Sequence, residues 1–140
     1  MQLEINNTTK NKINKKILAQ AALIFDKNFK IGDKAISVAI VGDTAIKNLN
    51  KKYRNKDNIT DVLSFSGDKN SEMFGEIIIC YSQIKRQAKK LNVSVRDELI
   101  FIFIHGLLHL AGYDDNTKKG WQEMEEIGSR LCKSVIAGKA

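Results

Sequence analysis

The most constraining feature of the sequence is the stretch of residues 99–110, in which every residue is apolar except two histidines and a glycine. A helix that is apolar around its whole circumference is stable only when other elements cover it, so the rest of the chain has to fold around this segment. Ser94 followed by Asp97 is typical of a capping box, with an acid in place of the usual Glu or Gln, and Gly112 readily ends a helix. We therefore predict a buried helix at the centre of the fold.

The two histidines in this helix, His105 and His109, are the only histidines of the chain. Residues four positions apart lie on the same face of a helix, so both imidazoles can reach one ion. After Gly112 the chain can turn and bring Asp114 and Asp115 back towards this face. Two nitrogen donors, one oxygen donor and an open position form the ligand set of a catalytic zinc site, whereas two unrelated core or surface histidines are the less favoured interpretation. The spacing therefore predicts a metal site.

The remaining segments predict an α+β fold. Period-two patterns and β-branched runs predict about four strands, and apolar stripes at helical spacing predict about five helices. The strands are expected in residues 2–6, 36–41, 59–65 and 74–81, and the helices in residues 10–25, 43–53, 84–91, 94–110 and 117–135. Thr117 is expected to cap the last helix, with Trp121 and Met124 on its inner face. With 140 residues and no linker-like stretch, we expect one domain over residues 1–140, with a mixed sheet and the metal site on the central buried helix.

The composition narrows the class of partner. The formal net charge of +7 favours an acidic partner, most commonly nucleic acid, although a soluble protein that is merely basic would show the same charge. The cysteines, Cys80 and Cys132, are far apart and are expected to be reduced thiols of a cytosolic protein. The sequence has no signal pattern and no apolar run of membrane-spanning length, so we expect a cytoplasmic protein without a membrane partner.

The residue after the first histidine separates two kinds of metal-dependent hydrolase. In the HExxH helix of metalloproteases a glutamate at this position acts as general base. Here the position is Gly106, which cannot accept a proton. A phosphodiester gains from a metal ion and an arginine together because charge develops on its non-bridging oxygens. The sequence therefore favours a polyanionic substrate, and a small hydrolase of peptides or of other substrates is the weaker alternative.

Four motifs along the chain resemble one family. The buried helix carries His-Gly-Leu-Leu-His followed by Gly-Tyr-Asp, which is similar to the HGxLHLxGYDH signature of the YbeY family of rRNA maturation factors. Residues 49–54 (LNKKYR) are similar to the LNxxYR helix of that family, and residues 60–65 (TDVLSF) match its TDVLSF strand. Residues 75–77 (GEI) stand where the family usually has GDI. These motifs cover nearly the whole chain, which makes them far more specific than a histidine pair.

The resemblance implies a function, partners and a ligand set. It implies a metal-dependent, single-strand-specific endoribonuclease that matures the 3′ end of small-subunit 16S rRNA and acts in ribosome quality control. The implied partners are ribosomal RNA and the small ribosomal subunit, with ribosomal proteins or assembly GTPases. The family holds zinc with three histidines, and His105 and His109 match two of them. A non-catalytic RNA-binding ribosome-assembly factor with a structural metal is the alternative.

At the third ligand position this chain has Asp115, where the family normally has histidine. A carboxylate oxygen binds zinc at about the same distance as an imidazole nitrogen, so the substitution keeps a ligand at this position. We predict that Asp115 is the third ligand and that Asp114 orients a histidine or the turn, the reverse assignment being the alternative. Because the carboxylate lowers the positive charge of the site, a harder divalent metal such as Mn²⁺ is an alternative to zinc.

Arg54, within the LNKKYR motif, matches an arginine of the family's cleft. Its planar guanidinium is expected to hold the scissile phosphate, so that Arg54, His105 and His109 are the predicted catalytic residues. Thr60 and Ser64 are expected in the wall of the cleft. A basic surface that follows the phosphates of RNA is predicted from Lys51, Lys52, Arg54, Lys56, Lys85, Arg86, Lys89 and Lys90.

Overall fold

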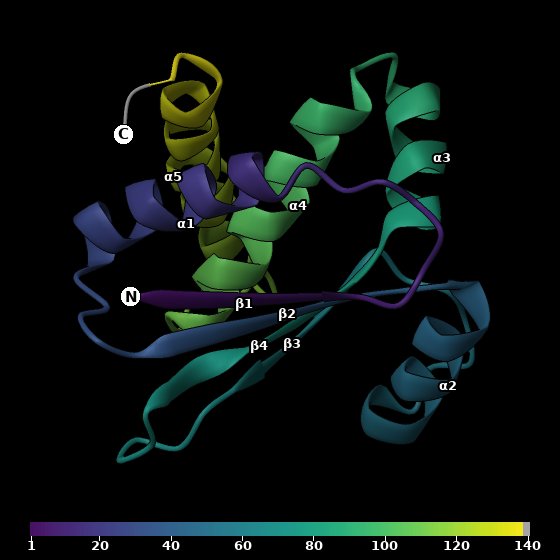
Figure 1. The fold of residues 1–140 in the computed structure, drawn as a ribbon, viewed down its shortest axis with the longest axis horizontal. Helices are drawn as coiled ribbons and strands as arrows, with labels where there is room; N and C mark the ends of the chain where they lie inside the picture. Colours follow the sequence, from purple (N-terminus) through teal and green to yellow (C-terminus); the bar gives the residue numbers. More distant parts are fainter. Residues whose placement is uncertain (139–140) are drawn as a thin grey trace.

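The computed structural model describes residues 1–138, which form four strands and five helices (Figure 1). In chain order these are β1 (Gln2–Asn7), α1 (Lys15–Phe29), β2 (Ala35–Val41), α2 (Asp43–Arg54), β3 (Val62–Ser66), β4 (Met73–Cys80), α3 (Tyr81–Leu91), α4 (Val95–Leu110) and α5 (Lys118–Ile136). The predicted α+β class is confirmed. None of the helices within residues 1–138 is both long enough and apolar enough to span a membrane.

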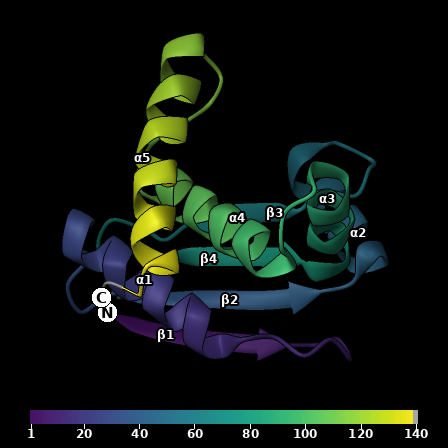
Figure 2. The ribbon, with the colours of Figure 1, turned by 90° about the horizontal axis from the view of Figure 1, so that it is seen from above.

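The four strands form one mixed sheet in the order β1-β2-β4-β3. The pairs β1–β2 and β2–β4 are parallel, and β3 runs antiparallel to β4 with Ser64 opposite Ile77. Seen from above, α4 crosses the β4–β3 side of the sheet, while α1 lies nearer β1 and β2 (Figure 2). The antiparallel edge strand β3 therefore lies beside the helix that carries the histidines.

The two faces of the sheet are covered unequally. Ile77 and Ile79 of β4 point into the main core, to which α1, α4 and α5 contribute, whereas Ile78 and Cys80 pack with Ile46 of α2 on the other face. Figure 1 shows α2 alone below the sheet, with the other helices above it. Because all three isoleucines are at most 6% exposed, the prediction of a strand covered on both faces is confirmed.

Helix α4 is the most buried of the helices within residues 1–138, as its composition predicts. It packs against α5, α3, α1 and strand β3, and its start is capped by Ser94, whose hydroxyl accepts a hydrogen bond from the backbone N–H of Asp97. Gly106 allows the close approach to the sheet, since a Cβ there would lie 3.2 Å from Oγ of Ser64. The position that holds a catalytic glutamate in metalloproteases thus faces the sheet in this protein.

Two local predictions are corrected by the structure. The strand expected over residues 59–65 begins only at Val62, and the residues before it form an irregular segment that lines the cleft described below. Trp121, expected on the inner face of α5, is 53% exposed, whereas Met124 is buried and Thr117 caps the helix as predicted. The apolar stripe of α5 is therefore narrower than its sequence indicates.

Candidate metal centre

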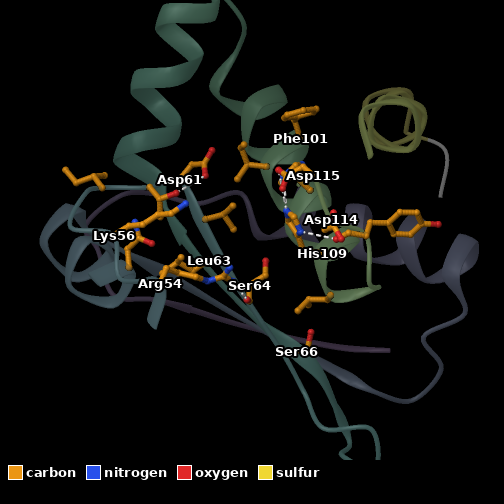
Figure 3. A pocket seen from close by; sticks show the side chains of 18 of the residues that line it. Arg54, Lys56, Asp61, Leu63, Ser64, Ser66, Phe101, His109, Asp114 and Asp115 are labelled. Carbon is orange, nitrogen blue, oxygen red and sulfur yellow. Dashed lines mark hydrogen bonds and ion pairs between the residues drawn. The ribbon is translucent and has the colours of Figure 1, made fainter. Parts of the chain in front are cut away.

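Helix α4 leaves one stripe of its surface uncovered. Within residues 98–110, all residues are buried except Phe101, His105 and His109, which follow one another at intervals of four and so share one face. This stripe lines a cleft of about 870 Å³ (Figure 3). The other lining residues come from the C-terminal end of α2, residues 58–64 with Ser66, and the turn after α4. The histidine face is thus open to a ligand, although the helix itself is central.

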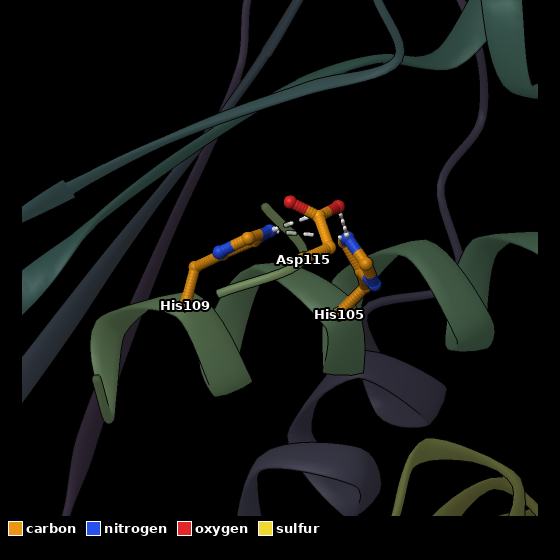
Figure 4. Close-up of side chains that lie close together, drawn as sticks. All are labelled: His105, His109 and Asp115. Atoms are coloured by element: carbon orange, nitrogen blue, oxygen red, sulfur yellow. Dashed lines mark hydrogen bonds and ion pairs between the residues drawn. The ribbon is translucent and has the colours of Figure 1, made fainter. Parts of the chain in front are cut away.

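Three side chains converge in this cleft (Figure 4). The Nε2 atoms of His105 and His109 lie 3.1 Å apart, and Oδ2 of Asp115 lies 3.6 Å from the former and 3.9 Å from the latter. A tetrahedral zinc site with bonds of about 2.0–2.1 Å places its ligand atoms roughly 3.4 Å apart. The donor set and its spacing therefore fit a divalent ion with three protein ligands and an open position.

The orientation of His109 is set by a backbone contact. Its Nδ1 lies 3.1 Å from the carbonyl oxygen of Tyr113. A carbonyl oxygen only accepts, so in the neutral ring Nδ1 carries the proton and Nε2 presents its lone pair to the cluster. Metal-ligating histidines commonly donate their second ring N–H in this way. The turn after α4 thus selects the tautomer that can bind a metal.

His105 is held in its neutral form. Burial lowers the pKa of His105, and the neighbouring His109 lowers it further, while Asp115 acts in the opposite direction. A metal binds the neutral imidazole, so a lowered pKa reduces competition by protons. The electrostatics of the cluster therefore agree with its geometry.

The turn that presents Asp115 begins at Gly112, whose φ of +99° is accessible at low cost only to glycine. Asp115 points to the two histidines, whereas Oδ1 of the neighbouring Asp114 accepts a hydrogen bond from the backbone N–H of Asn116 at 3.1 Å. This geometry favours Asp115 over Asp114 as the third ligand. Asp114 shapes the turn through this hydrogen bond.

Arg54 lines the same cleft from the last residue of α2. Its Nη2 donates a hydrogen bond of 3.0 Å to the carbonyl oxygen of Ser64, and its guanidinium carbon lies 5.9 Å from the centre of the Phe65 ring. Ser64 in turn donates to the carbonyl oxygen of Gly106 at 3.3 Å. Strand β3 thus connects Arg54 to α4, and the remaining N–H groups of the guanidinium are free to bind a phosphate in the cleft.

The other basic residues predicted to contact RNA are divided among several places. Lys56 lines the cleft with Arg54, and Lys51 and Lys52 lie on the exposed side of α2. On α3, Arg86 forms an ion pair with Asp43, its Nη2 lying 2.7 Å from Oδ1. The hydrogen bond from this arginine is the main reason why the pKa of Asp43 is lowered. The prediction also included three lysines that lie on α3, and none of them lines the cleft: Lys85, Lys89 and Lys90.

Two features of the cleft were missed by the sequence analysis. Phe101 lies in the wall with its ring centre 6.3 Å from that of His105, and its position four residues before that histidine is the signal that points to it. Asp61 also lines the cleft, and Nε2 of Gln87 donates to its carboxylate and to that of the buried Glu98. Burial raises the pKa of Glu98. This network links α3 and α4 to the cleft wall.

Together, the fold and the cleft define a small α+β protein with a candidate metal-binding group in a cleft that an arginine also lines. Comparison with known proteins identifies the particular family. The sequence pattern described as Endoribonuclease YbeY matches residues 2–135. The Endoribonuclease YbeY of Mycoplasmopsis synoviae is 40% identical over 112 residues, which cover 74% of this chain and 72% of the relative. That of Persephonella marina is 32% identical over 129 residues, with 88% and 84% covered.

A solved structure shows the same fold. The solution structure of TM1509 from Thermotoga maritima superposes with a TM-score of 0.70 at 31% identity, and the match covers 98% of this chain and 91% of that one. The chain belongs to the YbeY family of endoribonucleases. The predicted family and the predicted class of enzyme are therefore confirmed.

Proposed function

We propose that this protein is a metal-dependent, single-strand-specific endoribonuclease whose centre consists of His105, His109 and Asp115 together with Arg54. The observation that carries the proposal is the convergence of three donor atoms, all within 4.8 Å of one another, in the cleft that Arg54 also lines. Such a cleft offers a cation site and a phosphate-binding group side by side. A phosphodiester is the substrate that uses both.

The proposed cofactor is one zinc ion, with Mn²⁺ as the alternative that the carboxylate of Asp115 favours. A divalent cation held by these residues would supply Lewis-acid polarisation of a phosphoryl oxygen and would lower the pKa of a water molecule. The residues of the cleft fix the orientation of the metal-binding side chains and the position of α4. His109 is fixed in its tautomer by Tyr113, and the packing of Gly106 against Ser64 holds α4 close to β3.

Arg54 is proposed to bind the scissile phosphate. The planar fork of an arginine guanidinium matches two phosphate oxygens. The hydrogen bond to the backbone of Ser64 fixes one end of the fork before the substrate arrives. A positioned cation of this kind stabilises the negative charge that develops on the phosphoryl oxygens.

The proposed context is the maturation of the 3′ end of small-subunit 16S rRNA and ribosome quality control in the cytoplasm, by a single domain over residues 1–140. The partners would be ribosomal RNA, the small ribosomal subunit and its proteins or assembly GTPases. The net charge of +7 supports an RNA partner, because basic groups replace the counterions of phosphates. The basic surface proposed for this contact comprises Lys51, Lys52, Arg54, Lys56, Lys85, Arg86, Lys89 and Lys90.

A cleavage assay tests the proposal. The purified protein is incubated with a single-stranded RNA and with a hairpin RNA, with and without a chelator, and the metal content is measured in parallel. We expect cleavage of the single strand, loss of cleavage with chelator, and recovery on addition of Zn²⁺ or Mn²⁺. A protein that binds small-subunit particles but cuts neither RNA would instead be a ribosome-assembly factor.

A further inference from the structure

Next to the cleft, two aromatic side chains lie between two cationic ones in a row of contacts that starts at Arg54. The guanidinium of Arg54 lies 5.9 Å from the ring centre of Phe65, the rings of Phe65 and Tyr53 lie 5.3 Å apart, and Nζ of Lys52 lies 5.2 Å from the ring centre of Tyr53. These four residues, here called the α2–β3 strip, come from the end of α2 and from β3. Their contacts form a continuous chain that begins at the proposed phosphate-binding residue.

The exposure of Tyr53 is not explained by the core. Phe65 packs into the small cluster between α2 and the sheet, whereas Tyr53 contacts it edge to face and leaves 55% of its own surface exposed. One exposed aromatic residue is ordinary on a protein surface. Here the exposed ring has a cation on one side and, through Phe65, a second cation on the other. This arrangement offers a ring for stacking and two charges for phosphates.

We propose that the α2–β3 strip binds the single-stranded RNA segment next to the scissile phosphate, with one base stacked on Tyr53. Proteins that bind single strands combine a basic path for the backbone with aromatic rings for the bases. Since a base inside a duplex has both faces covered by its neighbours, the strip selects unpaired nucleotides. This inference rests on the proposed function for the position of the scissile phosphate at Arg54.

The charges favour RNA over a protein as the occupant. Lys52 and Arg54 carry two positive charges, and the whole chain has a formal net charge of +7. An apolar partner would leave these charges without a counter-ion, whereas the phosphates of a nucleic acid pair with them. A second copy of this basic chain would bring further positive charge to the same place.

The test is equilibrium binding of a fluorescein-labelled, uridine-rich RNA dodecamer in chelator, which prevents cleavage. Tyr53→Leu removes the ring but keeps an apolar side chain, and Tyr53→Phe keeps the ring. Trp121→Leu is the matched control, because Trp121 is 53% exposed but lies on α5. We expect binding about 5- to 150-fold weaker for Tyr53→Leu and nearly unchanged for the other two variants.

Two further measurements separate stacking from other effects. A dodecamer that lacks the base at every nucleotide should bind the native chain and Tyr53→Leu equally, because there is no base to stack. The dependence of affinity on salt should be unchanged in Tyr53→Leu, since no phosphate contact is lost, and should become shallower in Lys52→Gln. Equal losses with intact and base-free RNA, or no loss with either, would overturn the proposal.

The remaining outcomes are also decisive. If Tyr53→Leu converts a dimer into a monomer in sedimentation, the strip is a self-contact and the RNA proposal is wrong. Cleavage by the native chain is measured separately. If the native chain cuts RNA but Tyr53→Leu binds RNA as tightly as the native chain, only the proposal for the α2–β3 strip is refuted. A protein that binds through Tyr53 but cuts no RNA refutes the proposed function and leaves the strip in place.

Discussion

Replacement of Asp115 by alanine is expected to weaken zinc binding by more than about 100-fold. Oδ2 of Asp115 lies 3.6 Å from Nε2 of His105 and 3.9 Å from Nε2 of His109, so the variant retains only two of three converging donors. Loss of a residue that merely orients a ligand weakens metal binding by about 10- to 100-fold. The loss of a direct ligand should therefore exceed the upper end of that range, as isothermal titration with Zn²⁺ would show.

Thermal unfolding gives an independent measure of the zinc affinity of the native chain and of Asp115→Ala. A ligand that binds only the native state stabilises it by about 2.7 kcal/mol at a free concentration of about 100 Kd. At the same zinc concentration, a Kd weakened about 100-fold leaves about 0.4 kcal/mol. For a domain of roughly this size, in which 1 kcal/mol shifts Tm by about 2–4 °C, zinc should raise Tm by about 5–11 °C in the native chain and by about 1–2 °C in the variant.

Asp114→Ala is the matched control for this prediction. It removes the same charge one residue away, but the side chain of Asp114 accepts a hydrogen bond from the backbone N–H of Asn116 and is not part of the converging group of His105, His109 and Asp115. We expect its zinc affinity to fall by less than about tenfold. An unchanged affinity in Asp115→Ala, or a larger loss in Asp114→Ala, would show that the ligand is assigned to the wrong residue. Elemental analysis of Asp115→His, which restores the family's usual ligand, should show metal in both the variant and the native chain.

Three further predictions concern the cleft wall, the core and a thiol. Arg54→Ala should abolish RNA cleavage while Tm and zinc affinity stay the same, and retained cleavage would exclude its phosphate-binding role. Gly75→Ala should lower the free energy of unfolding in urea by about 1–3 kcal/mol, because a Cβ there would lie 2.8 Å from the carbonyl oxygen of Phe65. Gly128→Ala should not destabilise the protein, because its Cβ would meet only Cδ1 of Leu108, at an ordinary contact distance of 3.9 Å. Burial raises the pKa of Cys132 to about 12, so its contribution to stability is full below about pH 8.5 and declines as the pH rises towards 12. In urea titrations the free energy of unfolding of the native chain should therefore fall relative to that of Cys132→Ala above pH 9, and a constant difference would contradict the burial of this thiol.

The local properties of α4 could be predicted because they are carried by consecutive residues. A segment that is apolar on all sides has to be buried, and residues four apart share a face whatever the rest of the chain does. The placement of Asp115 followed from Gly112, since the positive φ of this glycine lets the chain turn back within a few residues. The histidine pair, the candidate acids Asp114 and Asp115 and the central position of the helix were therefore predictable from consecutive residues, whereas the choice of Asp115 came from the family resemblance.

The tertiary structure decided which stripe of α4 is open to solvent. Phe101 and Phe103 are the same residue type, and each lies between two isoleucines in the sequence. Nevertheless, Phe103 is fully buried and Phe101 lines the cleft. The difference depends on which stripe of the helix the sheet and the other helices leave uncovered. The prediction that Trp121 is buried was wrong for the same reason. An apolar stripe in the sequence of α5 does not show how much of that stripe the neighbouring elements cover.

By itself the sequence determined the helix and its donor atoms, which are separated by at most ten residues along the chain. Arg54 and His105 lie about fifty residues apart in the sequence, and the tertiary structure brings both to one cleft. Strand β3 pairs with β4 at the edge of the sheet, and its Ser64 contacts both Arg54 and α4. Helical spacing fixes short distances through the backbone, whereas long-range proximity depends on which strands pair and which faces they cover. The resemblance to the family motifs predicted that Arg54 and His105 share one cleft, and the fold supplies the physical cause.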